Sequence, residues 1–159
     1  MTSNFEKVKL FNKAFGVQTN TVSEKNLFDT NPKLVQYRLD LILEEVQELQ
    51  VAIKQKDFTE VIDAIGDILY VVYGAATAFG FSADKAFQII QDSNMSKLCK
   101  TEEDAIMTVK LYKEELPQRY DSPNYRLSED GIHWVVFNQS TMKILKNYKY
   151  VPANFTSII

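Results

Sequence analysis

The chain has 159 residues, of which 45% are hydrophobic and 25% are charged, and its formal net charge is −3. This composition is typical of a soluble globular protein, and the length predicts a single domain, 1–159, with a core of its own. A net negative charge without a basic tract argues against nucleic acid as the main partner. The single cysteine, Cys99, permits no internal disulfide, so we expect a reducing, cytoplasmic location. The apolar stretch 68–81 is too short to span a bilayer, and we expect no membrane partner.

The first half of the chain predicts three helices. A short amphipathic helix is expected over 3–15, followed by a polar loop over 17–31. Proline suits the first turn of a helix, so a long helix is expected to begin at Pro32 and run over 32–55. A tight turn then leads to a second long, strongly apolar helix over 58–79.

The two long helices carry six carboxylates: Glu44, Glu45, Glu48, Glu60, Asp63 and Asp67. At roughly 100° per residue, the acids of each helix share one side. If the helices pair antiparallel about residue 56, Asp63 lies level with Glu48 to within about one residue rise of 1.5 Å. Asp67 lies level with Glu45 in the same way. Like charges gathered in this manner repel one another, and a bound cation relieves the repulsion.

A solvated acidic face is the alternative interpretation. In the second helix, however, every position from 61 to 76 is apolar or small except Asp63, Asp67 and two tyrosines. Acids on an otherwise buried helix need a compensating charge, which favours a metal site. Carboxylates alone favour Mg²⁺, with Mn²⁺ as a substitute, whereas zinc prefers histidine and cysteine ligands, and the one histidine, His133, lies elsewhere in the sequence.

The second half of the chain predicts two more helices. Ser82 is the expected cap of a helix that runs to about Asp92. A capping box formed by Thr101 and Asp104 begins another helix over 102–115, which Pro117 would terminate.

The remaining residues predict a β-hairpin. A strand is expected over 133–137 and a second over 142–146, joined by a turn. The expected architecture is therefore mainly α, an antiparallel helical bundle over 1–116 with a small C-terminal β-hairpin in an extension over 117–159. The apolar surface of the two long helices exceeds what one short helix can cover, so we also expect a homodimer.

Several motifs resemble one enzyme superfamily. Glu44-Glu45-x-x-Glu48 followed by Glu60-x-x-Asp63 resembles the metal signature of the all-α nucleoside triphosphate pyrophosphohydrolases, which include MazG-like, dimeric dUTPase-like and phosphoribosyl-ATP pyrophosphohydrolase-like proteins. Residues 63–70 resemble their second metal-binding helix, and Ser93-Asn94-Met95-Ser96-Lys97 resembles the segment after their fourth helix. Lys146 with Lys149-Tyr150-Val151-Pro152 resembles a C-terminal motif of one subgroup. One departure is that only 11 residues separate Glu48 from Glu60.

The resemblance implies cleavage of a nucleoside triphosphate to the monophosphate and pyrophosphate, with two or three Mg²⁺ ions per site. It further implies that Glu44 orients or deprotonates the attacking water. The implied metal ligands are Glu45, Glu48, Glu60 and Asp63. The implied substrate-binding residues are Asp67, Asn94, Lys97 and Lys146.

Two further residues have open interpretations. Arg38, on the same helix as the first acids, is either a surface residue or a phosphate-binding residue, and Tyr70 either stacks on the substrate or packs in the core. The substrate also stays open. A dUTP or non-canonical nucleotide hydrolase, a phosphoribosyl-ATP hydrolase and a non-catalytic helical interaction module are the three alternatives.

Overall fold

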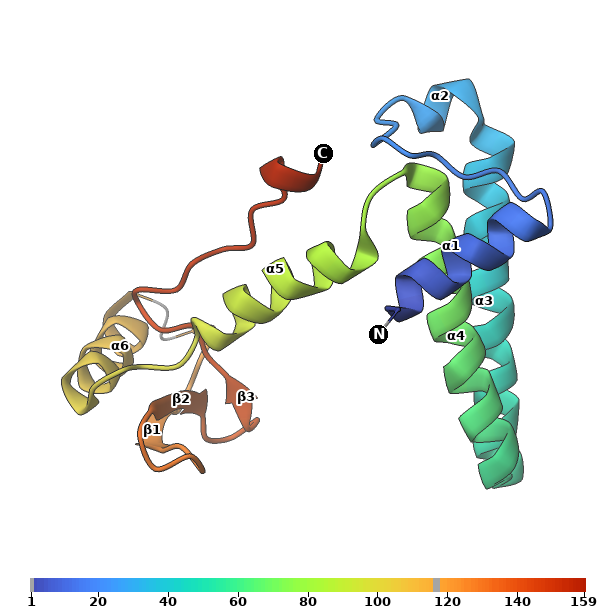
Figure 1. The fold of residues 1–159 in the computed structure, drawn as a ribbon. Helices are drawn as coiled ribbons and strands as arrows, with labels where there is room; N and C mark the ends of the chain where they lie inside the picture. Colours follow the sequence, from blue (N-terminus) through green and yellow to red (C-terminus); the bar gives the residue numbers. More distant parts are fainter. Residues whose placement is uncertain (1, 116–117) are drawn as a thin grey trace. The chain divides into compact units, whose positions relative to one another are not determined.

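The computed structural model describes residues 2–115 and 118–159. Contacts divide the chain into two compact units, one of Met1–Phe87 with Phe155–Ile159 and one of Gln88–Asn154 (Figure 1). The division falls upstream of residue 117, where the sequence predicts the extension to begin. That the two units act as one domain stays a prediction.

The first unit begins with α1 (Asn4–Ala14), close to the predicted 3–15. Ser3 caps the helix, because its Oγ accepts a hydrogen bond of 3.2 Å from the backbone amide of Glu6. A second, four-residue helix, α2 (Leu27–Thr30), lies where the sequence predicts a loop. One turn of helix shows no periodicity in the sequence, and its Leu27 is 2% exposed, so burial of this side chain holds it in place.

The two long helices have the predicted bounds. α3 spans Pro32–Gln55 and α4 spans Phe58–Phe79, and they pack against each other as an antiparallel hairpin (Figure 1). The Asp57 carboxylate caps α4 by accepting from the amides of Thr59 and Glu60 at 3.0 and 3.2 Å. These caps satisfy amides that a helix leaves unpaired, which explains why the boundaries could be predicted from the sequence.

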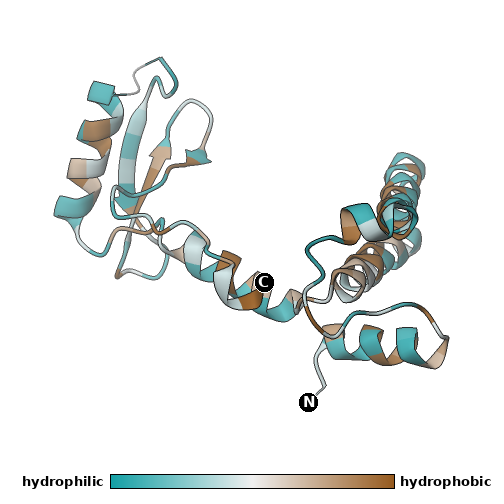
Figure 2. Ribbon diagram, turned by 90° about the horizontal axis from the view of Figure 1, so that it is seen from above, coloured by the Kyte–Doolittle hydropathy of each residue, from teal (hydrophilic) through white to brown (hydrophobic). Residues whose placement is uncertain are grey.

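Much of the apolar surface of this hairpin is exposed. Phe58 is 76% exposed, Ile62 59% and Leu69 51%. Figure 2 shows brown, hydrophobic segments on these helices among hydrophilic ones in teal. The inference that Asp63 and Asp67 lie on an otherwise buried helix is therefore wrong for the single chain. By length and composition alone α4 could also cross a membrane, with 28% of its most apolar window buried, but core helices meet the same criterion.

The second unit contains most of α5 (Ala83–Met95) and all of α6 (Glu102–Glu115). α5 continues three residues beyond the predicted end at Asp92, and α6 has the predicted bounds. Ser93 does not end α5, because its Oγ bonds to the C-terminal segment at 2.9 Å and so does not compete for its own helix backbone. The predicted terminator, Pro117, lies outside the described residues.

A three-stranded antiparallel sheet completes the second unit, in the order β1 (Pro123–Leu127), β2 (Trp134–Asn138) and β3 (Lys143–Ile144). The predicted hairpin corresponds to β2 and β3. β1 was not predicted, because Pro123 reads as a turn signal, yet a proline is tolerated as the first residue of an edge strand. The core of this unit consists of Cys99, Ala105, Val109, Val136 and Leu145.

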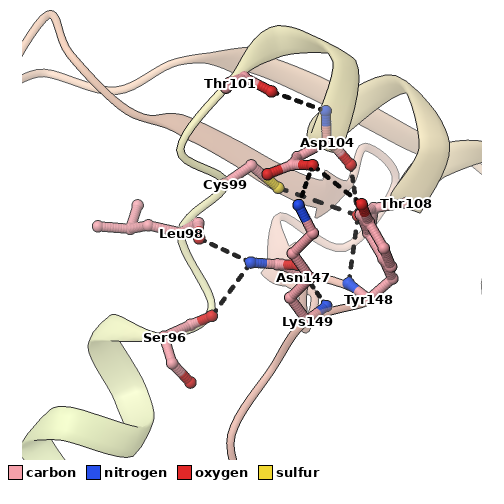
Figure 3. Close-up of polar contacts among 9 residues, drawn as sticks. All are labelled: Ser96, Leu98, Cys99, Thr101, Asp104, Thr108, Asn147, Tyr148 and Lys149. Carbon is pink, nitrogen blue, oxygen red and sulfur yellow. Dashed lines mark hydrogen bonds and ion pairs between the residues drawn. The ribbon is translucent and has the colours of Figure 1, made fainter.

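Polar contacts tie α6 to the C-terminal segment (Figure 3). Asp104 Oδ1 accepts from Lys149 Nζ at 2.7 Å and from the Tyr148 hydroxyl at 3.0 Å. Only half of the predicted capping box forms as a result. Thr101 Oγ1 accepts from the Asp104 amide at 3.2 Å, whereas the Asp104 carboxylate serves Lys149 and Tyr148 instead.

Candidate functional site

The acids predicted as a cluster come together on the α3–α4 hairpin. The half-buried Glu45 has its pKa raised, first by burial and then by the negative charges of Glu48, Asp67, Glu44 and Asp63. Two of these neighbours come from each helix, so the antiparallel pairing of the acids is present in the folded chain. The proximity of several carboxylates at neutral pH opposes the ionisation of Glu45 and favours the binding of a cation.

A surface groove of about 470 Å³ lies beside these acids, toward the turn of the hairpin. Glu44 and Glu48 of α3 and Glu60 of α4 line it together with Gln47, Val51, Ala52 and Gln55. Glu60 therefore shares the groove with two acids of the other helix. Glu48 both lines the groove and contributes to the raised pKa of Glu45. Carboxylates and side-chain amides are the oxygen donors that hard divalent cations prefer.

Side chains in the described part of the chain do not converge on a point in the way that coordinated ligands do. Within those residues, no three His, Cys, Asp or Glu side chains form a group that could already hold a metal ion. The donor set nevertheless fits Mg²⁺ or Mn²⁺, because it consists of carboxylates on two packed helices, all of them exposed except the half-buried Glu45, and their mutual repulsion acts on Glu45. The roles of individual acids as ligands stay a prediction.

Arg38 is the residue whose environment differs most from its expected one. It is 6% exposed, so its interpretation as a surface residue is wrong. Its Nε and Nη2 atoms are buried without a hydrogen-bond partner, and burial lowers its pKa. Gly74 of α4 lies opposite, and a Cβ added there would be 3.1 Å from Nη1.

Tyr70, which continues the acidic side of α4, contacts an aromatic ring of α1. Its ring meets that of Phe11 edge-on with centroids 5.5 Å apart, and Tyr70 is 39% exposed. The packing interpretation therefore has a contact in its favour, while the exposed part of the ring leaves room for a ligand.

The remaining predicted site residues, Asn94, Lys97 and Lys146, belong to the second unit. Lys97 Nζ donates to Asn94 Oδ1 at 2.7 Å, so the predicted pair of phosphate-binding residues is preformed. Lys146 Nζ lies 4.3 Å from the centre of the Tyr150 ring and borders a hollow of about 350 Å³. Tyr112, Tyr148 and Tyr150 line the same hollow, an aromatic feature that their separation in the sequence concealed.

The motif at 93–97 and the C-terminal motif at 146–152 form one structure. The Ser96 hydroxyl accepts from the Val151 amide at 3.0 Å, and the Ser93 hydroxyl lies 2.9 Å from both the Tyr150 hydroxyl and the Val151 carbonyl. Asn147 Nδ2 adds bonds to the carbonyls of Ser96 and Leu98, of 3.3 and 2.8 Å (Figure 3). Sequence separation hid this pairing, because 54 positions lie between the two residues of the first bond.

Comparison with known proteins places this arrangement in a family. A family model described as phosphoribosyl-ATP pyrophosphohydrolase matches residues 8–94, more than half of the chain. The chain belongs to this family. It is a pyrophosphohydrolase family within the all-α nucleoside triphosphate pyrophosphohydrolase superfamily, which confirms the resemblance drawn from the motifs and supports a hydrolase that acts on nucleotides.

A curated relative extends over nearly the whole chain. The uncharacterized protein L479 of Acanthamoeba polyphaga mimivirus is 28% identical, and the alignment covers 99% of this chain and 96% of that protein. The family match includes α3, α4 and all six acids, and it ends at Asn94. Lys97, Lys146 and most of the second unit lie beyond it.

Proposed function

We propose that this member of the phosphoribosyl-ATP pyrophosphohydrolase family is a Mg²⁺-dependent nucleoside triphosphate pyrophosphohydrolase. Its products would be a nucleoside monophosphate and pyrophosphate. The observation that carries the proposal is the groove that Glu44 and Glu48 of α3 share with Glu60 of α4, in a segment that the family model matches. A site that repels added negative charge until a cation arrives suits a metal-dependent reaction on phosphates.

The proposal assigns the acids of the hairpin to two tasks. Glu45, Glu48, Glu60 and Asp63 would hold Mg²⁺, or Mn²⁺ in its place, with two or three ions per site. Such cations, when bound, supply positive charge that neutralises the phosphate oxygens of the substrate. Asp67, one helical turn along α4 from Asp63, would contact substrate or metal at the edge of the acidic cluster.

Glu44 is the proposed general base. It lines the groove with Glu48 and Glu60 and is exposed, so water reaches it. In the reaction a water oxygen attacks a phosphorus atom of the triphosphate, the anhydride bond between the α- and β-phosphates breaks, and pyrophosphate leaves. The Glu44 carboxylate accepts the proton that the attacking water loses.

Asn94, Lys97 and Lys146 are the proposed phosphate or nucleoside contacts of the second unit. Lysine ammonium groups bind phosphate as point charges, and the Asn94 amide holds the Lys97 ammonium at 2.7 Å. Tyr70 would stack on sugar or base with its exposed part.

Two substrate classes remain as candidates. The motif of Lys146 with Lys149-Tyr150-Val151-Pro152, which resembles a C-terminal motif of one subgroup, favours a nucleotide such as dUTP or a non-canonical nucleoside triphosphate. The description of the matching family favours phosphoribosyl-ATP. A non-catalytic helical module is the third candidate, and it predicts no turnover of any nucleotide.

The exposed apolar side of the hairpin supports a homodimer. Ile62, Leu69 and Val72 are 59, 51 and 41% exposed in the single chain, and a second copy would cover them. A cytoplasmic location, without a nucleic-acid or membrane partner, completes the proposal. The cysteine is free and buried, as a reducing compartment permits.

The decisive experiment is a panel of nucleotides that includes dUTP and phosphoribosyl-ATP, incubated with and without Mg²⁺, with monophosphate and pyrophosphate scored separately. Glu48→Gln and Asp63→Ala should abolish both turnover and the rise in melting temperature that Mg²⁺ causes in the parent. Asp40→Asn, on another side of α3, is the matched control. If Mg²⁺ raises the melting temperature of both acid variants as it does the parent's, the acids do not bind the metal.

A further inference from the structure

Arg38 and Gly74 occupy the same seam between α3 and α4 as the acids. Arg38 and Glu45 are seven residues apart on α3, and Asp67 and Gly74 are seven apart on α4. On an ideal helix seven residues bring a side chain back to within about 20° and advance it by about 10.5 Å. The Arg38–Gly74 pair is therefore the next level of the seam beyond the Glu45–Asp67 pair.

The guanidinium of Arg38 has no anionic partner among the described residues. Nε and Nη2 are buried and make no hydrogen bond; burial lowers the pKa of Arg38, and the neighbouring Tyr37 opposes that shift. Its one aromatic contact is with the same residue, the Tyr37 ring centre lying 5.8 Å from Cζ. A buried charge is normally paired, so this environment is that of a site that still lacks its anion.

Gly74 is the reason that the guanidinium fits beside α4. A Cβ at this position would lie 3.1 Å from Nη1, closer than an ordinary van der Waals contact. Glycine inside a helix weakens it relative to alanine, so its presence here has a packing reason. Because no hydrogen bond or ion pair in the described chain anchors the guanidinium, it can turn toward a ligand without breaking one.

We propose that Arg38, seated on Gly74, binds a phosphate group of the nucleotide at the end of the seam opposite the hairpin turn. The inference rests on the proposed function, because it takes the anion to be part of a nucleotide. A guanidinium offers planar paired donors that match phosphate oxygens. The seam then offers a positive charge about two helical turns from the acids that would hold the cations.

The test is calorimetric binding of two probes in the presence of Mg²⁺, an α,β-methylene nucleoside triphosphate, which is not cleaved at that bond, and inorganic pyrophosphate. Arg38→Met should weaken the binding of the nucleotide roughly 10- to 100-fold, as expected for the loss of hydrogen bonds to a charged group. Arg38→Lys should recover only part of the loss. An equal loss for both probes assigns Arg38 to the phosphate chain, and a loss confined to the nucleotide assigns it to a phosphate nearer the nucleoside.

Melting temperatures distinguish a role of Arg38 in ligand binding from a role in folding. Replacing a buried, unpaired charge by an apolar side chain of similar length is neutral or stabilising, so Arg38→Met should melt no lower than the parent. Gly74→Ala should also melt no lower, because alanine favours the helix, while displacing Nη1 by a few tenths of an ångström and weakening nucleotide binding by a small factor. Arg126→Met, a change of the same kind at an exposed arginine of the second unit, should leave both measurements as in the parent.

Three results would overturn the inference. In the first, Arg38→Met binds both probes as tightly as the parent; in the second, it melts lower than the parent while its binding is unchanged. In the third, the parent is a homodimer in sedimentation and Arg38→Met is a monomer, which would assign Arg38 to a carboxylate of the second copy. Failure of the proposed function is separate. A parent that binds the nucleotide through Arg38 but releases no pyrophosphate would refute the enzyme and leave this phosphate site standing.

Discussion

The core of the second unit and the α3–α4 hairpin of the first unit bury their side chains to different degrees. In the second unit Cys99, Ala105 and Val136 are completely inaccessible, and Asp104 and Asn147 make hydrogen bonds that tie α6 and the C-terminal segment together. In the first unit the two longest helices leave large apolar side chains such as Ile62 and Leu69 half exposed or more. The unit with the shorter elements therefore has the more complete core.

This difference distinguishes a part of the chain that completes its own core from a part that leaves polar and apolar groups without partners. In the second unit buried polar groups such as Asp104 and Asn147 have hydrogen-bond partners. The hairpin, in contrast, carries acids that repel one another, an unpaired arginine and uncovered apolar residues. We have proposed that cations, an anionic ligand and a second copy complete this surface. The family match covers α3 and α4.

The largest expected effect is on catalysis in the hairpin. Glu44→Gln keeps the size and hydrogen bonding of the side chain but removes its basicity, so kcat should fall roughly 10²- to 10⁴-fold while nucleotide and Mg²⁺ affinities change less than about tenfold. Steady-state kinetics with Mg²⁺ titration measures both. Asp40→Asn is the control. Equal losses of Mg²⁺ affinity in Glu44→Gln and Glu48→Gln would make Glu44 a ligand instead of the base.

The next effect is on the stability of the second unit. Leu145 is 1% exposed in the core around Cys99, so Leu145→Ala should lower the free energy of unfolding by about 2–5 kcal/mol. Chemical denaturation of the whole chain gives this value. Ile144→Ala, at the 48% exposed neighbouring position, should have a much smaller effect. Similar losses from both variants would mean that the core is not as closed as its accessibility indicates.

A somewhat smaller effect is expected on self-association of the first unit. Leu69→Lys should weaken the homodimer at least tenfold, because burial of one leucine is worth about 1.5–3 kcal/mol and a lysine there would have to be desolvated. Sedimentation over a concentration series measures the dissociation constant. Ile106→Lys, at a 50% exposed position of α6, is the matched control. A parent that is monomeric at micromolar concentration would remove the proposed dimer altogether.

The smallest effect concerns the ion pair of the second unit. Hydrogen bonds from Lys149, and then from Tyr148, hold the pKa of Asp104 below its ordinary value, and Asp104 with Tyr148 raises the pKa of Lys149 to about 12. The lowered acid contributes stability above its unfolded pKa and loses it as the pH falls through its folded pKa. The raised lysine loses its contribution as the pH rises toward about 12.

Lys149→Met should therefore lower the urea midpoint by a small, constant amount at neutral pH. The difference from the parent should shrink in acid, where Asp104 becomes protonated, and again in strong alkali. Lys113→Met, an exposed lysine of the same unit, is the control. A difference that grows in acid would contradict the direction of the Asp104 shift.

Local signals explain which parts of the structure could be predicted. The bounds of α3, α4 and α6 follow from caps and turns within a few residues, such as Asp57 and Thr101. The pairing of Glu45 with Asp67 follows from counting along two helices. α2 and β1 carry no such signal, because one is a single helical turn held by Leu27 and the other depends on pairing with β2.

The site was less accessible to sequence reasoning than the fold. The spacing of the carboxylates indicates a site in the sequence. The burial of Arg38, however, depends on Gly74, which lies 36 positions further along the chain and has no side chain. The tyrosines around Lys146 come from α6 and from the C-terminal segment and meet only after the chain has folded. Non-local packing determines both features, and a single sequence contains no local pattern for them.

The return of the chain to its first unit has a topological consequence. The second unit, Gln88–Asn154, is inserted between two segments of the first, and Ser23 Oγ donates to the carbonyl of Ile158 at 2.8 Å after that return. An inserted module can lengthen or shorten in evolution while the hairpin keeps its register.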